Sequence, residues 1–191
     1  MCGCGRIILS NGEIFFGDFI SGKMNGIGEY QRKDGSKYEG QLIEGIPHGK
    51  GKEQLSDGTI FEGKYDGGKK KEGKIIWKDG SSYEGHFEND TFNGKGTYNW
   101  GNKRQYEGEW KNGKMNGKGK LMYSDGSYYE GEFINGKKSG QGKYVWEKDK
   151  YYIGGWKDDK QNGKGKKVMG KAVLKFDLCD SIIDDIVYSL I

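Results

Sequence analysis

Apolar and polar residues alternate over short stretches of this chain, and the clearest stretch is Tyr-Glu-Gly-Glu-Trp at residues 106–110. Its tyrosine, glycine and tryptophan would lie on one face of a strand, and its two glutamates on the other. Alternation with a period of two is typical of a strand that buries one face. Two Asn-Gly pairs follow, which favour a chain reversal, and then a second alternating stretch. We therefore predict a β-hairpin over residues 106–128.

The same pattern recurs along most of the chain. An aromatic-x-Gly triplet begins each copy, at intervals of 22 or 23 residues, and a large apolar residue follows four positions after each start. A single hairpin is unstable in water, so neighbouring copies are expected to share one apolar row. Residues 15–171 are thus predicted to hold seven hairpin repeats, which start at Phe15, Tyr38, Phe61, Tyr83, Tyr106, Tyr129 and Tyr152.

Two parts of the array depart from this unit. The copy that starts at Phe61 is one residue short and has Glu72 where the first glycine of Gly-x-Gly is expected. A bulge or an altered turn is predicted there. Residues 1–14 match only the second half of a unit, so they are expected to form a lone edge strand.

Composition narrows the class of protein. Glycine accounts for 36 of the 191 residues, proline for one, and aromatic residues for 14%. Too little proline is present for collagen, and too many aromatic residues for a disordered linker. The net charge is +4 and only three of the 32 basic residues are arginine, which argues against sequence-specific nucleic-acid binding.

The termini and cysteines indicate a compartment. No stretch reaches the roughly 18 apolar residues of a membrane span, and the N-terminus lacks the pattern of a secretory leader. Three cysteines without a Cys-x-x-Cys pair argue against a disulfide framework or a zinc site. A reducing, cytoplasmic location is expected, and acylation of Cys2 or Cys4 stays open.

The repeat resembles a known family. Tyr-Glu-Gly-x-Trp, then Gly-Lys-x-x-Gly-x-Gly, then an Asp-Gly turn at a period of 23 residues is similar to the MORN repeat (membrane occupation and recognition nexus). The resemblance covers about residues 3–170. It implies an all-β fold, in which stacked hairpins form an elongated single-layer antiparallel sheet curled into a groove. It also implies roles in cytoskeletal and axonemal assemblies, radial-spoke heads among them, or in membrane tethering.

The last 20 residues, 172–191, have a different pattern. They contain no glycine and carry a net charge of −3. Their apolar residues follow helical spacing, which predicts a short C-terminal amphipathic helix. This helix would either cap the sheet or dock on a partner. The tail-docking residues would be Ile182, Ile183, Ile186 and Leu190.

No group of residues indicates catalysis. His48 and His86 occupy unrelated repeat positions, and no nucleophile recurs beside either of them. The Gly-Lys-Gly-Lys segments lack the spacing of a phosphate-binding loop. We therefore expect a protein that is not an enzyme and has no metal and no cofactor.

The leading hypothesis is a scaffold whose aromatic–glycine groove binds a helix or an extended segment of a partner protein. It would be a structural subunit of a cytoskeletal or axonemal assembly, in the cytoplasm or the cilium. Aromatic residues are enriched at protein interfaces. The expected groove residues are Tyr83, Phe87, Tyr106, Trp110, Tyr129, Phe133, Tyr152 and Trp156.

Two alternatives remain at this point. A peripheral module that binds phosphoinositides would use the basic cluster in the irregular repeat, since clustered lysines attract anionic lipid. The possible lipid contacts are Lys69, Lys70, Lys71 and Lys74. The other alternative is self-association, through the first strand or the tail helix.

Overall fold

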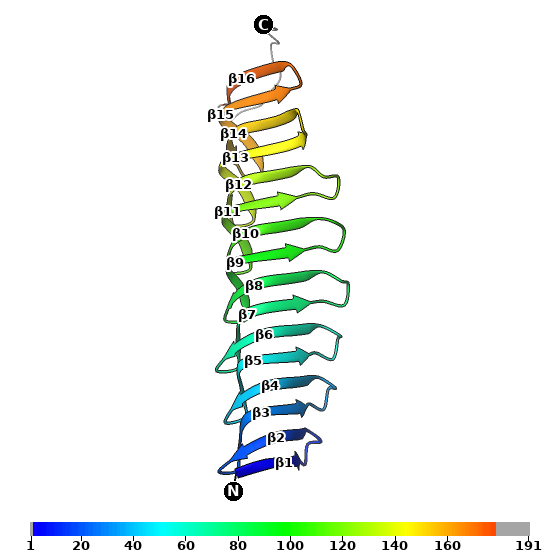
Figure 1. Cartoon of the computed structure of the whole chain (residues 1–191). Helices are drawn as coiled ribbons and strands as arrows, with labels where there is room; N and C mark the ends of the chain where they lie inside the picture. Colours follow the sequence, from blue (N-terminus) through cyan, green and yellow to red (C-terminus); the bar gives the residue numbers. More distant parts are fainter. Residues whose placement is uncertain (1, 179–191) are drawn as a thin grey trace. The chain divides into compact units, whose positions relative to one another are not determined.

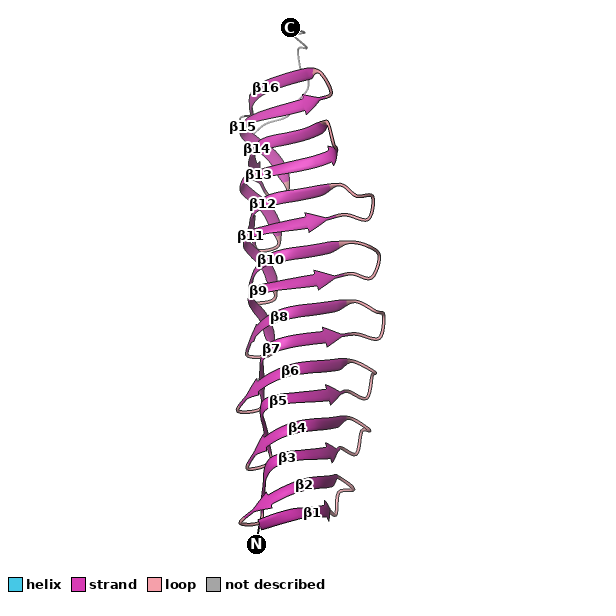
Figure 2. Ribbon diagram, in the orientation of Figure 1, coloured by secondary structure: helices cyan, strands magenta, loops and turns pink. Residues whose placement is uncertain are grey.

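The computed structural model describes residues 2–178, which form strands joined by short loops (Figure 1). Every regular element in this range is a β-strand (Figure 2), which confirms the predicted all-β class. The chain divides into two compact units, Met1–Asn93 and Gly94–Ile191.

In the first unit, each strand pairs antiparallel with the strand that follows it in the sequence. The unit is therefore a run of hairpins, as the repeat predicts. Its strands are β1 (Cys2–Ile8), β2 (Ile14–Ile20), β3 (Lys23–Gln31), β4 (Lys37–Ile43), β5 (Ile46–Gln54), β6 (Ile60–Asp66), β7 (Lys69–Ile76) and β8 (Ser82–Glu88), followed by the first residues of β9 (Thr91–Asn99).

The second unit repeats this arrangement from residue 94 onward. Its strands also pair antiparallel in sequence order. After the rest of β9 come β10 (Gln105–Lys111), β11 (Lys114–Met122), β12 (Tyr128–Ile134), β13 (Lys137–Glu147), β14 (Lys150–Lys157), β15 (Lys160–Met169) and β16 (Ala172–Leu178).

The C-terminal segment corrects the prediction of a helix over residues 172–191. Its first part, Ala172–Leu178, is the strand β16, because β15 offers unpaired backbone groups along its edge and the chain reverses at Gly170 to pair with them. The helical spacing of apolar residues starts only at Cys179. The expected docking residues Ile182, Ile183, Ile186 and Leu190 lie outside the described residues.

The expected irregularity is present in the repeat that starts at Phe61. Its two strands pair Lys64 with Glu72 and Tyr65 with Lys70, so Lys71 is an extra residue without a partner position. Lys64 and Glu72 also form an ion pair of 2.8 Å between Nζ and Oε2. The glutamate that replaces a glycine is thus part of an exposed charge pair beside a bulge.

The core of each unit consists of tyrosine rings that lie across glycines. Tyr106 is fully buried, and its hydroxyl donates a hydrogen bond of 2.9 Å to the carbonyl of Glu109. A Cβ atom built on Gly108 or Gly119 would overlap this ring, so only glycine leaves room for it. The equivalent fully buried tyrosines are Tyr38, Tyr83, Tyr129 and Tyr152.

Most of the longer turns are held by an Asp-Gly-Ser motif. In the turn after β11, the Ser127 hydroxyl donates a hydrogen bond of 2.7 Å to Asp125 Oδ1, and the Ser127 backbone N–H donates to the same oxygen at 2.9 Å. Gly126 between them has a φ of 88°, a left-handed conformation that glycine adopts without a steric penalty. Ser36 and Ser81 are buried in the same way.

The short hairpin turns connect each repeat to the one before it. Gly45 N–H donates a hydrogen bond of 2.8 Å to the carbonyl of Met24, which belongs to the preceding repeat. In the second unit, Gly136 N–H donates at 2.8 Å to the carbonyl of Met115. These bonds add a backbone link between repeats to the pairing of the strands.

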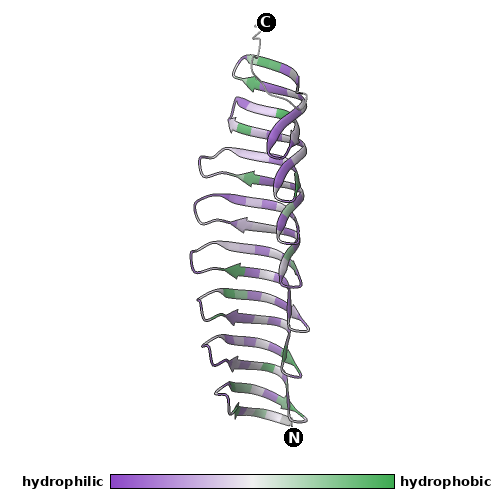
Figure 3. Ribbon diagram, turned by 180° about the vertical axis from the view of Figure 1, so that it is seen from behind, coloured by the Kyte–Doolittle hydropathy of each residue, from purple (hydrophilic) through white to green (hydrophobic). Residues whose placement is uncertain are grey.

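The face opposite the tyrosine rings is polar. In the first unit, charges of alternating sign lie side by side on β4 to β8, at Glu39, Lys52, Glu62, Lys74 and Glu84. Hydrophobic segments on the ribbon are correspondingly short and interrupted by hydrophilic ones (Figure 3). This face has the character of a solvated surface.

Candidate partner-binding face

The eight aromatic residues expected to line a groove are buried. Tyr106 has no exposed surface and Trp110 exposes 6% of its surface. Their rings meet edge to face at 5.1 Å between centroids, and the Trp110 indole N–H donates to the carbonyl of Gly96 at 3.0 Å. These rings support a surface rather than provide one, and the same holds for Tyr83, Phe87, Tyr129, Phe133, Tyr152 and Trp156.

A second set of aromatic residues in the second unit is only partly covered. We name it the aromatic shelf, and its members are Tyr98, Trp100, Tyr123, Tyr144 and Trp146. The ring centroids of Tyr98 and Trp100 are 4.6 Å apart, those of Tyr123 and Tyr144 are 5.8 Å apart, and those of Tyr144 and Trp146 are 5.0 Å apart. The shelf is therefore a continuous set of rings that water, or another chain, can reach.

Cations lie on these rings. The Arg104 guanidinium carbon is 4.4 Å from the centre of the Trp100 ring, and Lys167 Nζ is 5.2 Å from the centre of the Trp146 ring. Within residues 2–178, neither cation forms an ion pair with a carboxylate. Arg104 Nε is buried and has no hydrogen-bond partner in the same range. The shelf thus carries positive charge that the described residues do not neutralise.

A third cation, Lys138, lies among four rings. Its Nζ is 4.9 Å from the ring centre of Trp156 and 5.1 Å from that of Tyr144, and two further rings lie within 6 Å. Nζ also donates a hydrogen bond of 3.3 Å to the hydroxyl of Tyr123. Burial lowers the pKa of Lys138, although the nearby carboxylate of Asp159 opposes this shift. Burial likewise raises the pKa of Tyr123 to about 12.

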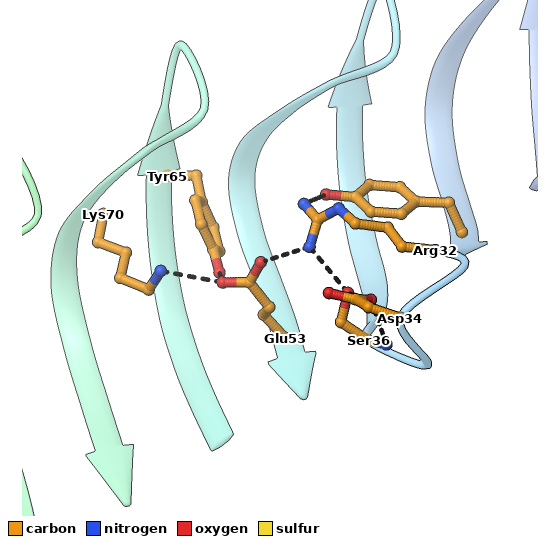
Figure 4. A network of polar contacts seen from close by, with 7 residues as sticks. Arg32, Asp34, Ser36, Glu53, Tyr65 and Lys70 are labelled. Atoms are coloured by element: carbon orange, nitrogen blue, oxygen red, sulfur yellow. Dashed lines mark hydrogen bonds and ion pairs between the residues drawn. The ribbon is translucent and has the colours of Figure 1, made fainter. Parts of the chain in front are cut away.

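The first unit has a carboxylate in the corresponding region, Glu53, at a position where most other repeats have an apolar residue. The side chain of Glu53 is 10% exposed and lies between two cations (Figure 4). Its Oε2 is 2.9 Å from Lys70 Nζ, and its Oε1 is 3.2 Å from Arg32 Nη1. Tyr65 donates a further hydrogen bond of 3.3 Å to Oε2. We name these four residues the Glu53 network.

The charges of the Glu53 network balance one another. Burial raises the pKa of the Glu53 carboxyl, but hydrogen bonds and charges from Lys70 and Arg32 outweigh burial and hold this pKa below its usual value. Burial and the negative charge of Glu53 raise the pKa of Tyr65. Arg32 also donates a hydrogen bond of 2.7 Å to the hydroxyl of Tyr30. This part of the first unit therefore satisfies its polar groups internally.

The four lysines considered as lipid contacts are each engaged. Lys69 Nζ donates to Asn89 at 2.8 Å, and Lys70 belongs to the Glu53 network. Lys71 and Lys74 lie 3.7 Å from Asp66 and Glu84. Lys70 stands on the aromatic face and Lys74 in the polar row, so the structure does not bring the four ammonium groups together.

Metal and membrane features were also considered. Within residues 2–178 there is no group of three His, Cys, Asp or Glu side chains that could hold a metal ion. In the same part of the chain, no helix has the length and apolar character needed to cross a membrane.

A comparison with protein families identifies the class of protein. The MORN repeat model matches six segments, residues 15–37, 38–60, 83–103, 106–128, 129–149 and 152–171. These segments make up more than half of the chain, and the chain therefore belongs to the MORN repeat family. The segment 61–82, which contains the Lys71 bulge, is not among the matched ranges.

Comparisons with individual proteins give less. The TCP domain of SAS-4 (dCPAP) from Drosophila melanogaster, solved in complex with a proline-rich motif of Ana2 (dSTIL), is similar with a TM-score of 0.51, 8% identity, and coverage of 91% of this chain and 88% of that one. A catalytically inactive virginiamycin B lyase from Staphylococcus aureus with quinupristin reaches a TM-score of only 0.18 at 16% identity, over 94% of this chain and 57% of that one. No curated protein matches the chain.

Proposed function

We propose that this chain is a non-catalytic scaffold whose aromatic shelf binds a segment of a partner protein. The observation that carries the proposal is the set of partly exposed rings in the second unit, with cations that no described carboxylate neutralises. Aromatic residues and arginine dominate the energetics of protein interfaces. The buried rings first expected to form the groove hold this shelf in place.

The comparisons support a protein-binding role. Repeat arrays commonly present extended surfaces to partners. The SAS-4 TCP domain, which resembles this chain in fold, has a segment of another protein bound to it. A structural role in a cytoskeletal or axonemal assembly of the cytoplasm or cilium is the finer part of the proposal. The phosphoinositide alternative has less support, because Lys69, Lys70, Lys71 and Lys74 each have a partner within the first unit.

A matched pair of variants tests the role of the shelf. The shelf variant is Trp100→Ala with Trp146→Ala, and the control is Met122→Ala with Ile153→Ala, which removes two exposed residues from the polar face of the same unit. Both are used as bait in native lysate, and recovered proteins are quantified by mass spectrometry. We expect the shelf variant to lose at least about tenfold of its main partner, as removal of a hot spot does, and the control to lose less than twofold.

Circular dichroism and a thermal melt establish that both variants fold. Equal recovery of every partner by the folded shelf variant and the control would overturn the proposal. Recovered tubulin-associated or axonemal proteins would support the finer assignment, and their consistent absence beside a different main partner would contradict it.

A further inference from the structure

The three shelf residues that begin or precede turns are evenly spaced. Trp100, Tyr123 and Trp146 occupy the same repeat position, on β9, β11 and β13 or directly after these strands. One strand, β10 or β12, lies between each successive pair. Since neighbouring strands are about 4.7–4.9 Å apart, the three positions recur about every 9.4–9.8 Å across the sheet.

This spacing selects one conformation of a bound segment. A polyproline II helix advances about 3.1 Å per residue with three residues per turn, so one of its edges presents a residue about every 9.3 Å. An extended strand presents same-face residues about every 6.6–6.8 Å, and an α-helix about every 5.4 Å, or 10.8 Å for two turns. Over the two steps from Trp100 to Trp146, the polyproline helix drifts by about 1 Å or less, whereas the α-helix drifts by about 2–3 Å.

The chemistry of the shelf fits proline. Proline-rich segments dock in grooves lined by aromatic rings, where they lose little conformational entropy, and they present backbone carbonyls as acceptors. Within residues 2–178, the indole N–H groups of Trp100 and Trp146 make no hydrogen bond, whereas those of the buried Trp110 and Trp156 donate to backbone carbonyls. Two indole donors thus remain for the carbonyls of a bound segment.

The charges of the shelf indicate what flanks the prolines. Arg104 lies on Trp100 and Lys167 lies on Trp146, at the two ends of the row of three positions. Neither forms an ion pair within the described residues. Complementary charge at the rim of an interface favours one partner over others, so acidic residues are favoured at both ends of the ligand.

We propose that the shelf binds a polyproline II segment that crosses β9 to β13 at right angles, with prolines at every third residue and acidic residues at both ends. This inference rests on the proposed function and gives the partner a chemical description. It commits to an extended, proline-rich protein segment and excludes an amphipathic helix as the ligand of the shelf.

Synthetic peptides test the period directly, because changing the ligand cannot unfold the protein. The test peptide is acetyl-Glu-Pro-Ala-Ala-Pro-Ala-Ala-Pro-Glu-amide. A control of the same composition places its three prolines next to each other, and a second control replaces both glutamates by lysine. Binding to the full chain is measured by tryptophan fluorescence and by calorimetry. We expect the test peptide to bind at least about tenfold more tightly than either control, since losing one good contact costs that much.

Protein variants then locate the site. Trp100→Ala should weaken the test peptide at least about tenfold, and Arg104→Gln should weaken it but leave the lysine-flanked peptide unchanged. Ile153→Ala, on the opposite face, should have no effect. Equal affinity for the test peptide and the clustered-proline control would overturn the inference, and so would no binding of either.

The two proposals fail in distinguishable ways. Partner recovery that depends on the shelf, together with no preference for the three-residue period, leaves the scaffold function standing and refutes the polyproline ligand. Partner recovery that does not depend on the shelf refutes the proposed function itself.

Discussion

The two units fill one set of equivalent positions in opposite ways. In the first unit, the slot that receives a lysine also holds a carboxylate and an arginine; in the second, it holds an apolar residue and an indole. The first set is Arg32, Glu53, Tyr65 and Lys70, and its counterpart is Trp100, Leu121, Phe133 and Lys138. Lys70 and Lys138 are therefore lysines on the same backbone frame with different surroundings.

This difference separates two tasks of the repeat. The Glu53 network closes a group of charges on itself, and little of that charge is left for another molecule. In the second unit, Lys138 is surrounded by rings, and the shelf stays cationic and aromatic. The repeat supplies the frame in both units, and the residues two and four positions after the second conserved glycine decide what each unit can bind.

The largest effect is expected from breaking the Glu53 network. Glu53→Leu leaves Lys70 and Arg32 without their carboxylate, and removing one partner of a buried ion pair costs about 3–5 kcal/mol. We expect a loss near the lower end, about 3 kcal/mol, because both cations keep some contact with water. Urea unfolding measures it.

A double variant sharpens this prediction. Adding Lys70→Met to Glu53→Leu should restore about half or more of the lost stability, because an apolar pair in a buried slot is tolerated better than a lone charge. A cost below about 1 kcal/mol for Glu53→Leu alone would show that the network is a surface pair in energetic terms.

A smaller effect is expected from transplanting the carboxylate to the second unit. Leu121→Glu places it in the slot next to Lys138, where no arginine is present. The substitution should destabilise the chain, and it should cost about 1–2 kcal/mol more when Lys138 is also replaced by Met, which is a typical coupling for neighbouring residues. Urea unfolding of the four members of this cycle gives the coupling, and purely additive costs would contradict the equivalence of the two slots.

The smallest effect is a difference in pH dependence. The pKa of Glu53 lies below its ordinary value of 4.5 in the folded chain, so its contribution to stability is complete above that value and disappears as the pH falls through the folded pKa. Stability should therefore fall less steeply in acid for Glu53→Gln than for the unchanged chain. Thermal melts from pH 7 to pH 3 measure this, and parallel curves would refute it.

The repeat pattern determined most of the fold in advance. Alternation around the aromatic-x-Gly triplets and the turn residues fixes each hairpin, because period-two burial and positive φ are local properties. The segment 172–178 was predicted wrongly. Its seven residues have no strong pattern of their own, and they pair with β15 because that edge is available.

The candidate site could be predicted only in part. Sequence alternation identifies which aromatic residues share a face, but not that each tyrosine ring folds over the glycines of its own hairpin and is thereby covered. A comparison of the copies would have revealed Glu53, since a carboxylate there replaces an apolar residue. Nothing local marks Lys138, because its surroundings come from rings on several strands.

The backbone bond from each short turn to the preceding repeat gives the array a direction of assembly. Gly45 and Gly136 donate backward along the chain, to Met24 and Met115. During synthesis, N-terminal segments fold first, so each new hairpin emerges when its acceptor is already in place. Trimming repeats from the C-terminal side leaves every remaining turn complete, whereas trimming from the N-terminal side deprives the new first turn of its acceptor. The chain is thus built to grow, and to tolerate shortening, at one end only.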